Sequence, residues 1–95
     1  MNECWWLYFL SCEGDLTYVG TAADVEARFK KHLSGRGARF TRINKPIEIL
    51  AAQPFPDRST ACKAEYALKQ CPLQKKREWA KEWPWMPDSW DRGPK

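Results

Sequence analysis

Short apolar segments separated by polar turns predict a small sheet. Residues 4–12 (CWWLYFLSC) form an apolar and aromatic run with the length and composition of a buried strand. Residues 13–15 (EGD) have turn chemistry and residues 16–20 predict a second strand, so the two strands should form a hairpin with a three-residue loop. Residues 46–51 (PIEILA) show alternation and predict a third strand.

The register of this hairpin decides which side chains share a face of the sheet. If Cys12 lies opposite Leu16, then Tyr8 lies opposite Gly20. Tyr8 and Tyr18 are then diagonal neighbours with backbones roughly 7–8 Å apart, whereas a slip of one residue would separate them. The face predicted by this register holds Trp6, Tyr8, Leu10 and Tyr18.

Helices are expected both before and after the third strand in the sequence. Asp24 is a suitable N-cap for a helix of about ten residues. The apolar stripe of that helix, at i, i+4 and i+8, consists of Val25, Phe29 and Leu33. Asp57 or Ser59 should cap a second helix that ends near Cys71, and a third helix is expected over residues 73–83. The predicted fold class is therefore α/β of the α+β kind, a small three-stranded antiparallel sheet flanked by about three helices.

The chain has 95 residues, 43% of them hydrophobic, which suits one globular domain. Residues 1–83 should form the folded domain, and residues 84–95, rich in Pro and Trp, an irregular tail. No apolar run reaches the roughly 18 residues of a membrane span, and the first residues lack the features of a signal peptide. We therefore expect a cytoplasmic protein.

Basic side chains gather in one part of the chain. The formal net charge is +4, and the seven basic residues from Arg28 to Lys45 have no acidic residue among them. A solvated basic face is the simplest interpretation, but a block without any acid is more typical of a polyanion-binding site. Much of this block falls in residues 36–46 (RGARFTRINKP), for which we expect a loop.

The cysteines give little support to a metal site. None of them forms a C-x-x-C pair, and the chain has one histidine. Reduced, partly buried thiols are the preferred interpretation. A cysteine-based metal or redox protein is kept as an alternative, which metal analysis of the purified protein would test. The residues concerned are Cys4, Cys12, Cys62 and Cys71.

An acidic residue interrupts the apolar arc of the second predicted helix. The arc consists of Ala61, Ala64 and Leu68. Glu65 lies about 40° from Ala61 on the helical wheel, where a charge is costly without a partner. Three interpretations stay open for Glu65: an ion pair with Lys69 at i+4, an ion pair with Arg28, or a metal ligand at the surface of the sheet.

Arg28 and His32 lie one turn apart on the same side of the first helix. Together with Tyr8 in WLY, the segment Tyr18-Val19-Gly20 and Glu65 in a later helix, they resemble the GIY-YIG nuclease superfamily in order and spacing. The likeness covers most of the chain. It is greatest to short stand-alone bacterial members, which share the run H-x-S-G-x-G-A-x-x-T-R (here HLSGRGARFTR) and the segment DRS…AE…K.

Some positions depart from the family pattern. Trp6 and Leu7 replace the glycine and isoleucine of the first motif, and Val19 replaces the isoleucine of the second. These replacements preserve strand character. Many members also have an asparagine about a turn or more after the metal-binding glutamate, and this chain has Lys76 and Arg77 in that region.

The resemblance implies hydrolysis of phosphodiester bonds with one divalent metal ion, usually Mg²⁺ and otherwise Mn²⁺. Glu65 matches the metal-binding glutamate, and Arg28 matches the arginine that holds the scissile phosphate. Tyr8 and Tyr18 match the motif tyrosines, one of which is a general base or orients the water. His32 matches a position that assists at the same site. The implied catalytic residues are Tyr8, Tyr18, Arg28, His32 and Glu65, with Glu65 as the metal ligand.

The basic block and the implied chemistry predict nucleic acid as the partner, and the resemblance favours DNA over RNA. Contacts with the backbone position a strand without reading its sequence, so we expect low sequence specificity. The predicted substrate-binding residues are Lys31, Arg36, Arg39, Phe40, Arg42, Lys45 and Lys69.

Aromatic residues favour single-stranded or branched DNA over plain duplex, because unpaired bases stack on such side chains. Phe40, between Arg39 and Arg42, is the better candidate. The tryptophans are further candidates, although covering the core is their simpler role; they are Trp83, Trp85 and Trp90. An inactive nucleic-acid-binding module of the same fold is the alternative function. Neither a membrane nor an obligate protein partner is expected.

Overall fold

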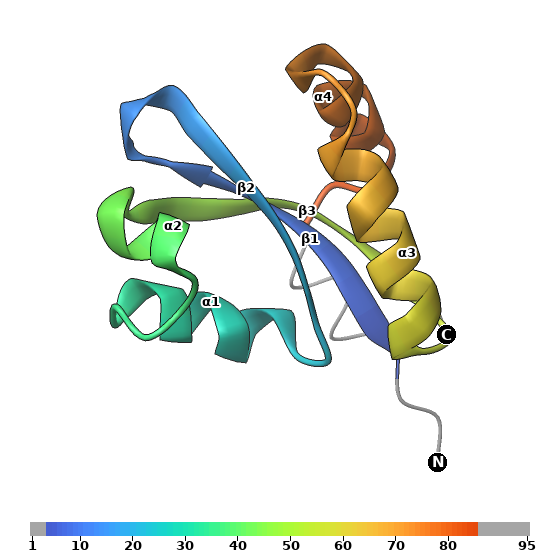
Figure 1. Cartoon of the computed structure of the whole chain (residues 1–95), viewed down its shortest axis with the longest axis horizontal. Coiled ribbons are helices and arrows are strands. Elements are labelled where there is room, and N and C mark those ends of the chain that lie inside the picture. Colours follow the sequence, from blue (N-terminus) through green and yellow to red (C-terminus); the bar gives the residue numbers. More distant parts are fainter. Residues whose placement is uncertain (1–3, 86–95) are drawn as a thin grey trace.

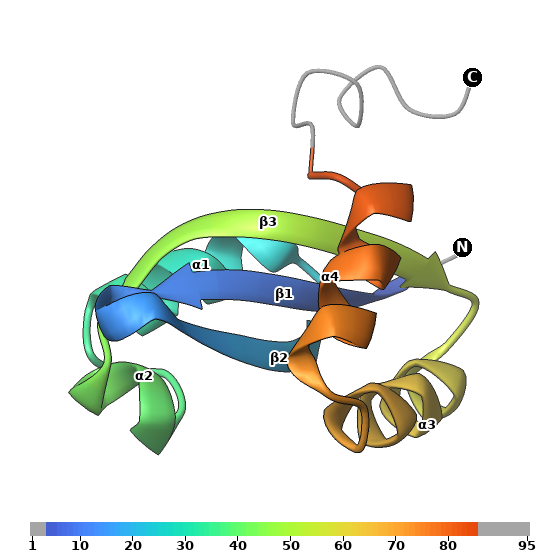
Figure 2. The same ribbon diagram turned by 90° about the horizontal axis from the view of Figure 1, so that it is seen from above.

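The computed structural model of the protein describes residues 4–85 and contains a three-stranded antiparallel sheet (Figure 1). Its strands and helices are β1 (Trp5–Cys12), β2 (Leu16–Ala22), α1 (Val25–Leu33), α2 (Arg39–Ile43), β3 (Pro46–Phe55), α3 (Arg58–Lys69) and α4 (Leu73–Glu82). The sheet separates α1 and α2 from α3 and α4, as Figure 1 and Figure 2 show. The predicted α+β class and antiparallel sheet are confirmed.

The first strand is the centre of the sheet, because the strand order is β2-β1-β3. A central strand covered by helices on both faces needs apolar side chains on both, which explains its unbroken apolar run. Leu7, Tyr8, Phe9 and Leu10 are all buried. The hairpin has the predicted register, with Tyr8 opposite Gly20, and β2 continues two residues beyond its predicted end.

The third strand is longer than predicted, since it runs to Phe55 and not only to Ala51. The added part contains Pro54, which has no amide proton to donate to a neighbouring strand. Pro54 lies opposite Trp6 in an edge strand, where proline is tolerated. A register shift between Phe9 and Leu10 marks an irregularity in its pairing with β1.

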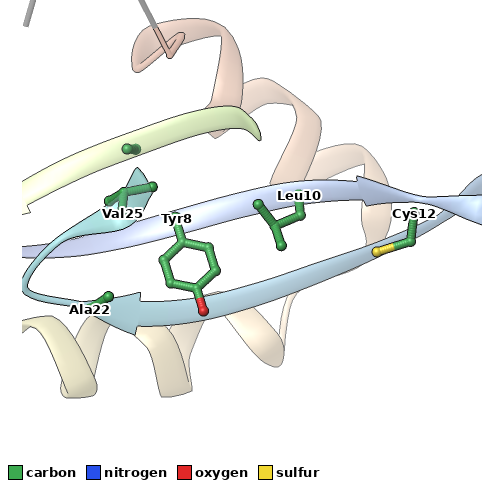
Figure 3. Close-up of a cluster of buried hydrophobic side chains, with 6 residues drawn as sticks. Tyr8, Leu10, Cys12, Ala22 and Val25 are labelled. Atoms are coloured by element: carbon green, nitrogen blue, oxygen red, sulfur yellow. The ribbon is translucent and has the colours of Figure 1, made fainter. Parts of the chain in front are cut away.

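Each face of the sheet has its own apolar core. The core beneath α1 consists of Tyr8, Leu10, Cys12, Ala22, Val25 and Ala52 (Figure 3). The core beneath α3 and α4 consists of Leu7, Phe9, Val19, Ala51 and Leu68, with Trp79 edge-on to Phe9 at 6.2 Å between ring centroids. Trp6 and Tyr18 pack on the first core, so the predicted shared face of the hairpin is confirmed.

The first helix buries a different stripe from the one predicted. Asp24 is its N-cap, as expected, and accepts a hydrogen bond from the Ala27 amide at 3.0 Å. Leu33, however, is 42% exposed, whereas His32 is 1% exposed. The reason is geometric. Seven residues advance a helix to about 20° short of two full turns, so i+7 lies closer to Val25 than i+8 does.

The segment expected to be a loop contains the short helix α2, whose single buried residue is Thr41. The next helix is capped by Asp57, which accepts a hydrogen bond from the Thr60 amide at 2.8 Å. It ends at Lys69, two residues before the expected end. The last helix ends at Glu82, close to its predicted end.

The outer edge of β3 is covered near its middle by the chain that follows α4. The Ala52 amide donates to the Trp83 carbonyl at 3.0 Å, and the Trp85 amide donates to the Leu50 carbonyl at 3.1 Å. Trp85 also packs against the core beneath α1, in line with a covering role. The rest of the predicted irregular tail, including Trp90, lies in residues 86–95, outside the described residues.

The four cysteines of the metal or redox alternative all lie within the described residues. The four cysteines are free thiols, and Cys12 among them is buried. Within residues 4–85 no three His, Cys, Asp or Glu side chains are grouped so that they could hold a metal ion. None of the helices in the same part of the chain has the length and hydropathy to cross a bilayer.

Candidate active site

Two phenols form the floor of the candidate site. Tyr8 on β1 and Tyr18 on β2 lie on the same face of the sheet, with ring centroids 6.3 Å apart. Gly20 makes this arrangement possible. A Cβ atom at this position would lie 2.5 Å from the Tyr8 hydroxyl oxygen and 2.9 Å from the Tyr18 ring. The glycine of the second motif therefore leaves the space that both tyrosines fill.

His32, on the last turn of α1, lies over both phenols. Its Nε2 atom is 2.8 Å from the Tyr8 hydroxyl oxygen, and this hydrogen bond is buried. The imidazole ring is edge-on to both tyrosines, with centroids 6.0 Å from Tyr8 and 5.3 Å from Tyr18. The predicted grouping of Tyr8, Tyr18 and His32 is therefore present in the structure.

A threonine that the sequence interpretation missed completes the surroundings of His32. Thr41 on α2 is 2% exposed, and its hydroxyl oxygen lies 2.7 Å from Nδ1 of His32. Gly37 also approaches this ring so closely that any Cβ at that position would overlap it. Both residues belong to the run HLSGRGARFTR, and their fixed spacing from His32 in that run was the available signal.

Arg28 lies one turn before His32 and has an unsatisfied donor. Its Nε atom is buried and has no hydrogen-bond partner among residues 4–85. Arg28 also lines a cavity of about 360 Å³ together with Thr21 and Arg58. A buried guanidinium donor without an acceptor is costly unless a ligand supplies one, and an oxyanion is the acceptor that suits it best.

Glu65 on α3 is paired with Lys69. The Lys69 ammonium lies 2.9 Å from Oε2 of Glu65 and 5.8 Å from the centroid of the Tyr18 ring. The first of the three open interpretations therefore applies to this structure, and no ion pair joins Glu65 to Arg28 within residues 4–85. The Glu65 side chain is 21% exposed and Lys69 47% exposed, so this pair borders on solvent.

The environment keeps the two central titratable groups neutral near pH 7. Burial, and to a smaller extent the neighbouring Tyr18, raises the pKa of Tyr8 well above its usual value. Arg28 opposes this shift and the charge of Glu65 adds to it, so both charges act on the Tyr8 hydroxyl. Burial, with Arg28 as a second cause, lowers the pKa of His32.

A metal ion at this site would find few protein ligands. Glu65 offers a carboxylate, and the phenols of Tyr8 and Tyr18 offer hydroxyl oxygens, which makes a hard, all-oxygen set. Magnesium suits such a set, because it retains several water ligands and is often bound through one or two carboxylates and the substrate. Lys69, the cation that pairs with Glu65, has a side chain that is 47% exposed.

The predicted substrate-binding cations lie on the surface beside this site. Those on and after α1 are all exposed, namely Lys31, Arg36, Arg39, Arg42 and Lys45. Phe40 is partly buried and stacks on Tyr18, with centroids 5.8 Å apart and ring planes at 23°. Phe40 therefore lines the site next to Tyr18. Whether it also stacks on a base stays a prediction.

Comparison with known proteins identifies the family. Residues 4–78 match the GIY-YIG catalytic domain. A UPF0213 protein of Xanthomonas campestris pv. campestris is 49% identical over 79% of this chain and 74% of its own length. A UPF0213 protein of Cupriavidus necator is 42% identical over 87% of this chain and 90% of its own length.

A solved structure agrees with these matches. The solution NMR structure of a UPF0213 protein from Bacillus halodurans is 35% identical and superposes with a TM-score of 0.52, covering 82% of this chain and 83% of that chain. UPF0213 homologues form a small stand-alone group with this domain, and a GIY-YIG domain supports a nuclease, which is a hydrolase. The chain belongs to the GIY-YIG family.

Proposed function

We propose that the protein is a metal-dependent DNA endonuclease that hydrolyses phosphodiester bonds with low sequence specificity, on single-stranded or branched DNA. The observation that supports this most is the environment of the Tyr8 hydroxyl. This hydroxyl is hydrogen-bonded to His32, and the charges of Arg28 and Glu65 both affect its pKa. One ionisable oxygen thus lies among a proton acceptor and a guanidinium from α1 and a carboxylate from α3.

Arg28 is suited to hold the scissile phosphate. Hydrolysis develops negative charge on the phosphoryl oxygens, and a guanidinium stabilises that charge through directed hydrogen bonds. The buried Nε of Arg28 has a proton to donate and no acceptor among residues 4–85, and the cavity beside it gives room for a phosphate. The proposed role uses the donor that the folded protein leaves unsatisfied.

Tyr8 is suited to remove a proton from the attacking water, provided that His32 accepts the proton of Tyr8. A phenol with a raised pKa is a poor base by itself. Proton transfer to Nε2 of His32, 2.8 Å away, leaves Tyr8 able to take one from water as the oxygen–phosphorus bond forms. The bond from phosphorus to the leaving oxygen breaks, and the proton stored on His32 is returned to the leaving oxygen or to solvent.

Glu65 is the residue that would hold Mg²⁺, or Mn²⁺ in its place. When bound there, the ion supplies Lewis-acid stabilisation of the phosphoryl charge. A single carboxylate with phenol oxygens nearby fits an ion that keeps most of its water ligands. Lys69 balances the charge of Glu65 in the structure, with its ammonium 2.9 Å from Oε2.

The substrate preference is proposed from the surface beside the site. The exposed cations from Lys31 to Lys45 offer contacts for phosphates, which give affinity without reading sequence. Phe40, between Arg39 and Arg42, adds an aromatic surface for an unpaired base. This combination favours strands that are single or that branch.

The alternative is an inactive nucleic-acid-binding module of the same fold, and one experiment separates the two. Labelled single-stranded, forked and duplex DNA, and RNA of the same sequence, are incubated with the protein in Mg²⁺ or in excess chelator, and binding is measured in parallel. We expect cleavage only with Mg²⁺, most of it on single-stranded or forked DNA. Binding without cleavage of any substrate would favour the module, and cleavage in chelator would refute the metal dependence.

A further inference from the structure

His32 is hydrogen-bonded at both ring nitrogens inside the protein. It is 1% exposed, with Nε2 at 2.8 Å from the Tyr8 hydroxyl and Nδ1 at 2.7 Å from the Thr41 hydroxyl. The Thr41 oxygen is in turn 2.9 Å from the carbonyl of Ala38. The three hydrogen bonds form one buried chain from Tyr8 through His32 and Thr41 to the backbone.

The direction of each hydrogen bond in this chain follows from counting protons. The Ala38 carbonyl can only accept, so the Thr41 hydroxyl donates its single proton to that oxygen. The Thr41 oxygen must then accept from His32, which places a proton on Nδ1. In a neutral imidazole Nε2 is then without a proton and accepts from Tyr8.

The other arrangements are less favourable. With the proton on Nε2, the Thr41 proton would turn towards His32, and two oxygens without a proton between them would face each other at 2.9 Å. A doubly protonated ring would force Nε2 to donate to Tyr8, and burial together with Arg28 disfavours that charge, as the lowered pKa of His32 reflects.

The segment after α1 is folded so that it places Thr41 on His32. α2 has five residues, too few to be stable alone, and Thr41 is its buried residue while Arg42 and Ile43 are exposed. Gly37 allows the chain to pass against the imidazole where any side chain would overlap it.

We infer that Thr41 is a positioning residue of the site, which fixes His32 as the Nδ1–H tautomer and leaves Nε2 free to accept the proton of Tyr8. The inference rests on the proposed nuclease function for its catalytic consequence. Its structural part, the tautomer, is independent of activity. Thr41 thereby acts on the reaction through His32 and does not itself touch substrate.

The test compares the intact protein with three variants. Thr41→Val keeps the branched shape and removes the hydroxyl, and Thr41→Ser restores a hydroxyl. Ser34→Ala removes an exposed hydroxyl that donates to the Lys31 carbonyl. Nitrogen-15 NMR of the single histidine reports which ring nitrogen carries the proton. Thermal melting shows that each variant is folded.

The expected result has two parts. The intact protein, Thr41→Ser and Ser34→Ala show a neutral ring protonated at Nδ1, whereas Thr41→Val shows both tautomers. Cleavage by Thr41→Val is slower by about ten- to a hundredfold in kcat with an unchanged KM, and Thr41→Ser recovers most of the rate.

The results that would overturn the role of Thr41 differ from those that would refute the proposed nuclease function. A proton on Nε2 in the intact protein overturns the inference whatever the activity, as does a Thr41→Val variant with wild-type tautomer and rate. An Nδ1–H ring in a protein that cleaves none of the tested substrates refutes the nuclease and the catalytic role, and leaves the tautomer assignment standing. Should Thr41→Val fail to fold, the intact protein and Thr41→Ser still decide the tautomer.

Discussion

At the scale of single residues, an absent side chain sets the geometry of the site. Gly20 leaves room for the Tyr8 hydroxyl and the Tyr18 ring, and no larger residue fits between them. Because Tyr8 must lie within hydrogen-bond distance of His32, the site needs the space at Gly20 as much as it needs the catalytic side chains.

Replacing Gly20 by alanine should therefore impair cleavage more than folding. The added Cβ pushes Tyr8 away from His32, and a displacement of about 1 Å at a reacting group costs about a hundredfold in rate. Overpacking should also lower the free energy of unfolding by about 1–3 kcal/mol. Thr17→Ala, on the other face of the same strand, is the matched control and should cleave at the wild-type rate. Wild-type cleavage by Gly20→Ala would contradict the proposed role of Tyr8.

The buried histidine should make stability depend on pH. Burial and Arg28 lower the pKa of folded His32, whereas an unfolded histidine titrates near about 6.5. As the pH falls, the unfolded chain takes up the proton first, so the free energy of unfolding decreases below about pH 7 and is fully retained above it.

Urea denaturation at several pH values between about 7.5 and 5 measures this effect. The chain has one histidine, so His32→Gln removes the effect cleanly and its stability should change less over the same interval. Two curves that fall in parallel would mean that folded His32 takes up a proton as readily as an unfolded histidine does.

The sequence predicted the positions of some site residues and missed others. Tyr8 and Tyr18 were placed together because strand alternation and hairpin register fix which face they occupy. Thr41 was missed because a residue that touches His32 across a turn leaves no periodic pattern. Hydrophobic periodicity in a loop does not reveal which of its polar side chains turns inwards.

At the scale of elements, the orientation of α1 places a polar residue against the core. Val25 and His32 are buried at i and i+7, and Leu33 is exposed. Apolar spacing alone favours Leu33, because it reflects hydrophobicity and no other cause of burial. The hydrogen bonds of His32 to Tyr8 and Thr41 satisfy its polar atoms and allow the helix to turn this residue inwards.

This orientation predicts unequal effects of two apolar truncations in α1. Val25→Ala should lower the free energy of unfolding by about 1.5–3 kcal/mol, because it empties a buried position. Leu33→Ala should change it by less than about 0.5 kcal/mol, because Leu33 is an exposed surface residue. Urea denaturation of both variants checks the prediction, and a larger loss from Leu33→Ala would support the i, i+4, i+8 stripe instead.

The two features that the sequence predicted least well, the helix α2 and the end of β3, depend on tertiary contacts. α2 is too short for a helical period to be visible, and it is held by Phe40 on Tyr18 and by Thr41 on His32. The end of β3 is held by its pairing with β1, although Pro54 is a poor strand residue.

At the scale of the whole molecule, the sheet divides two sets of exposed cations. One set follows α1 and α2, on the side of the sheet that contains the phenols (Figure 1). The other lies on α3 and α4, including Lys63, Lys75 and Arg77. Net charge alone does not distinguish these surfaces, and the proposed function assigns the substrate to the first.

Two triple variants with the same loss of charge test this assignment. Arg36, Arg39 and Arg42 replaced together by alanine should weaken DNA binding and reduce the salt slope of log K by up to about 0.7–0.9 per lost phosphate contact. The control replaces Lys63, Lys75 and Arg77 by alanine, and its salt slope should stay near that of the intact protein. If the control variant loses the salt dependence, the binding surface lies on α3 and α4.

The most direct measurement is single-turnover cleavage of labelled forked DNA by the intact protein and by Glu65→Gln, with Mg²⁺ and with excess chelator. The Gln side chain keeps the shape of Glu65 and removes the charge that would hold the ion. We predict cleavage by the intact protein with Mg²⁺, and a rate for Glu65→Gln lower by about a thousandfold or more at similar DNA affinity. Cleavage by Glu65→Gln at the wild-type rate, or cleavage by the intact protein in chelator, would contradict the account.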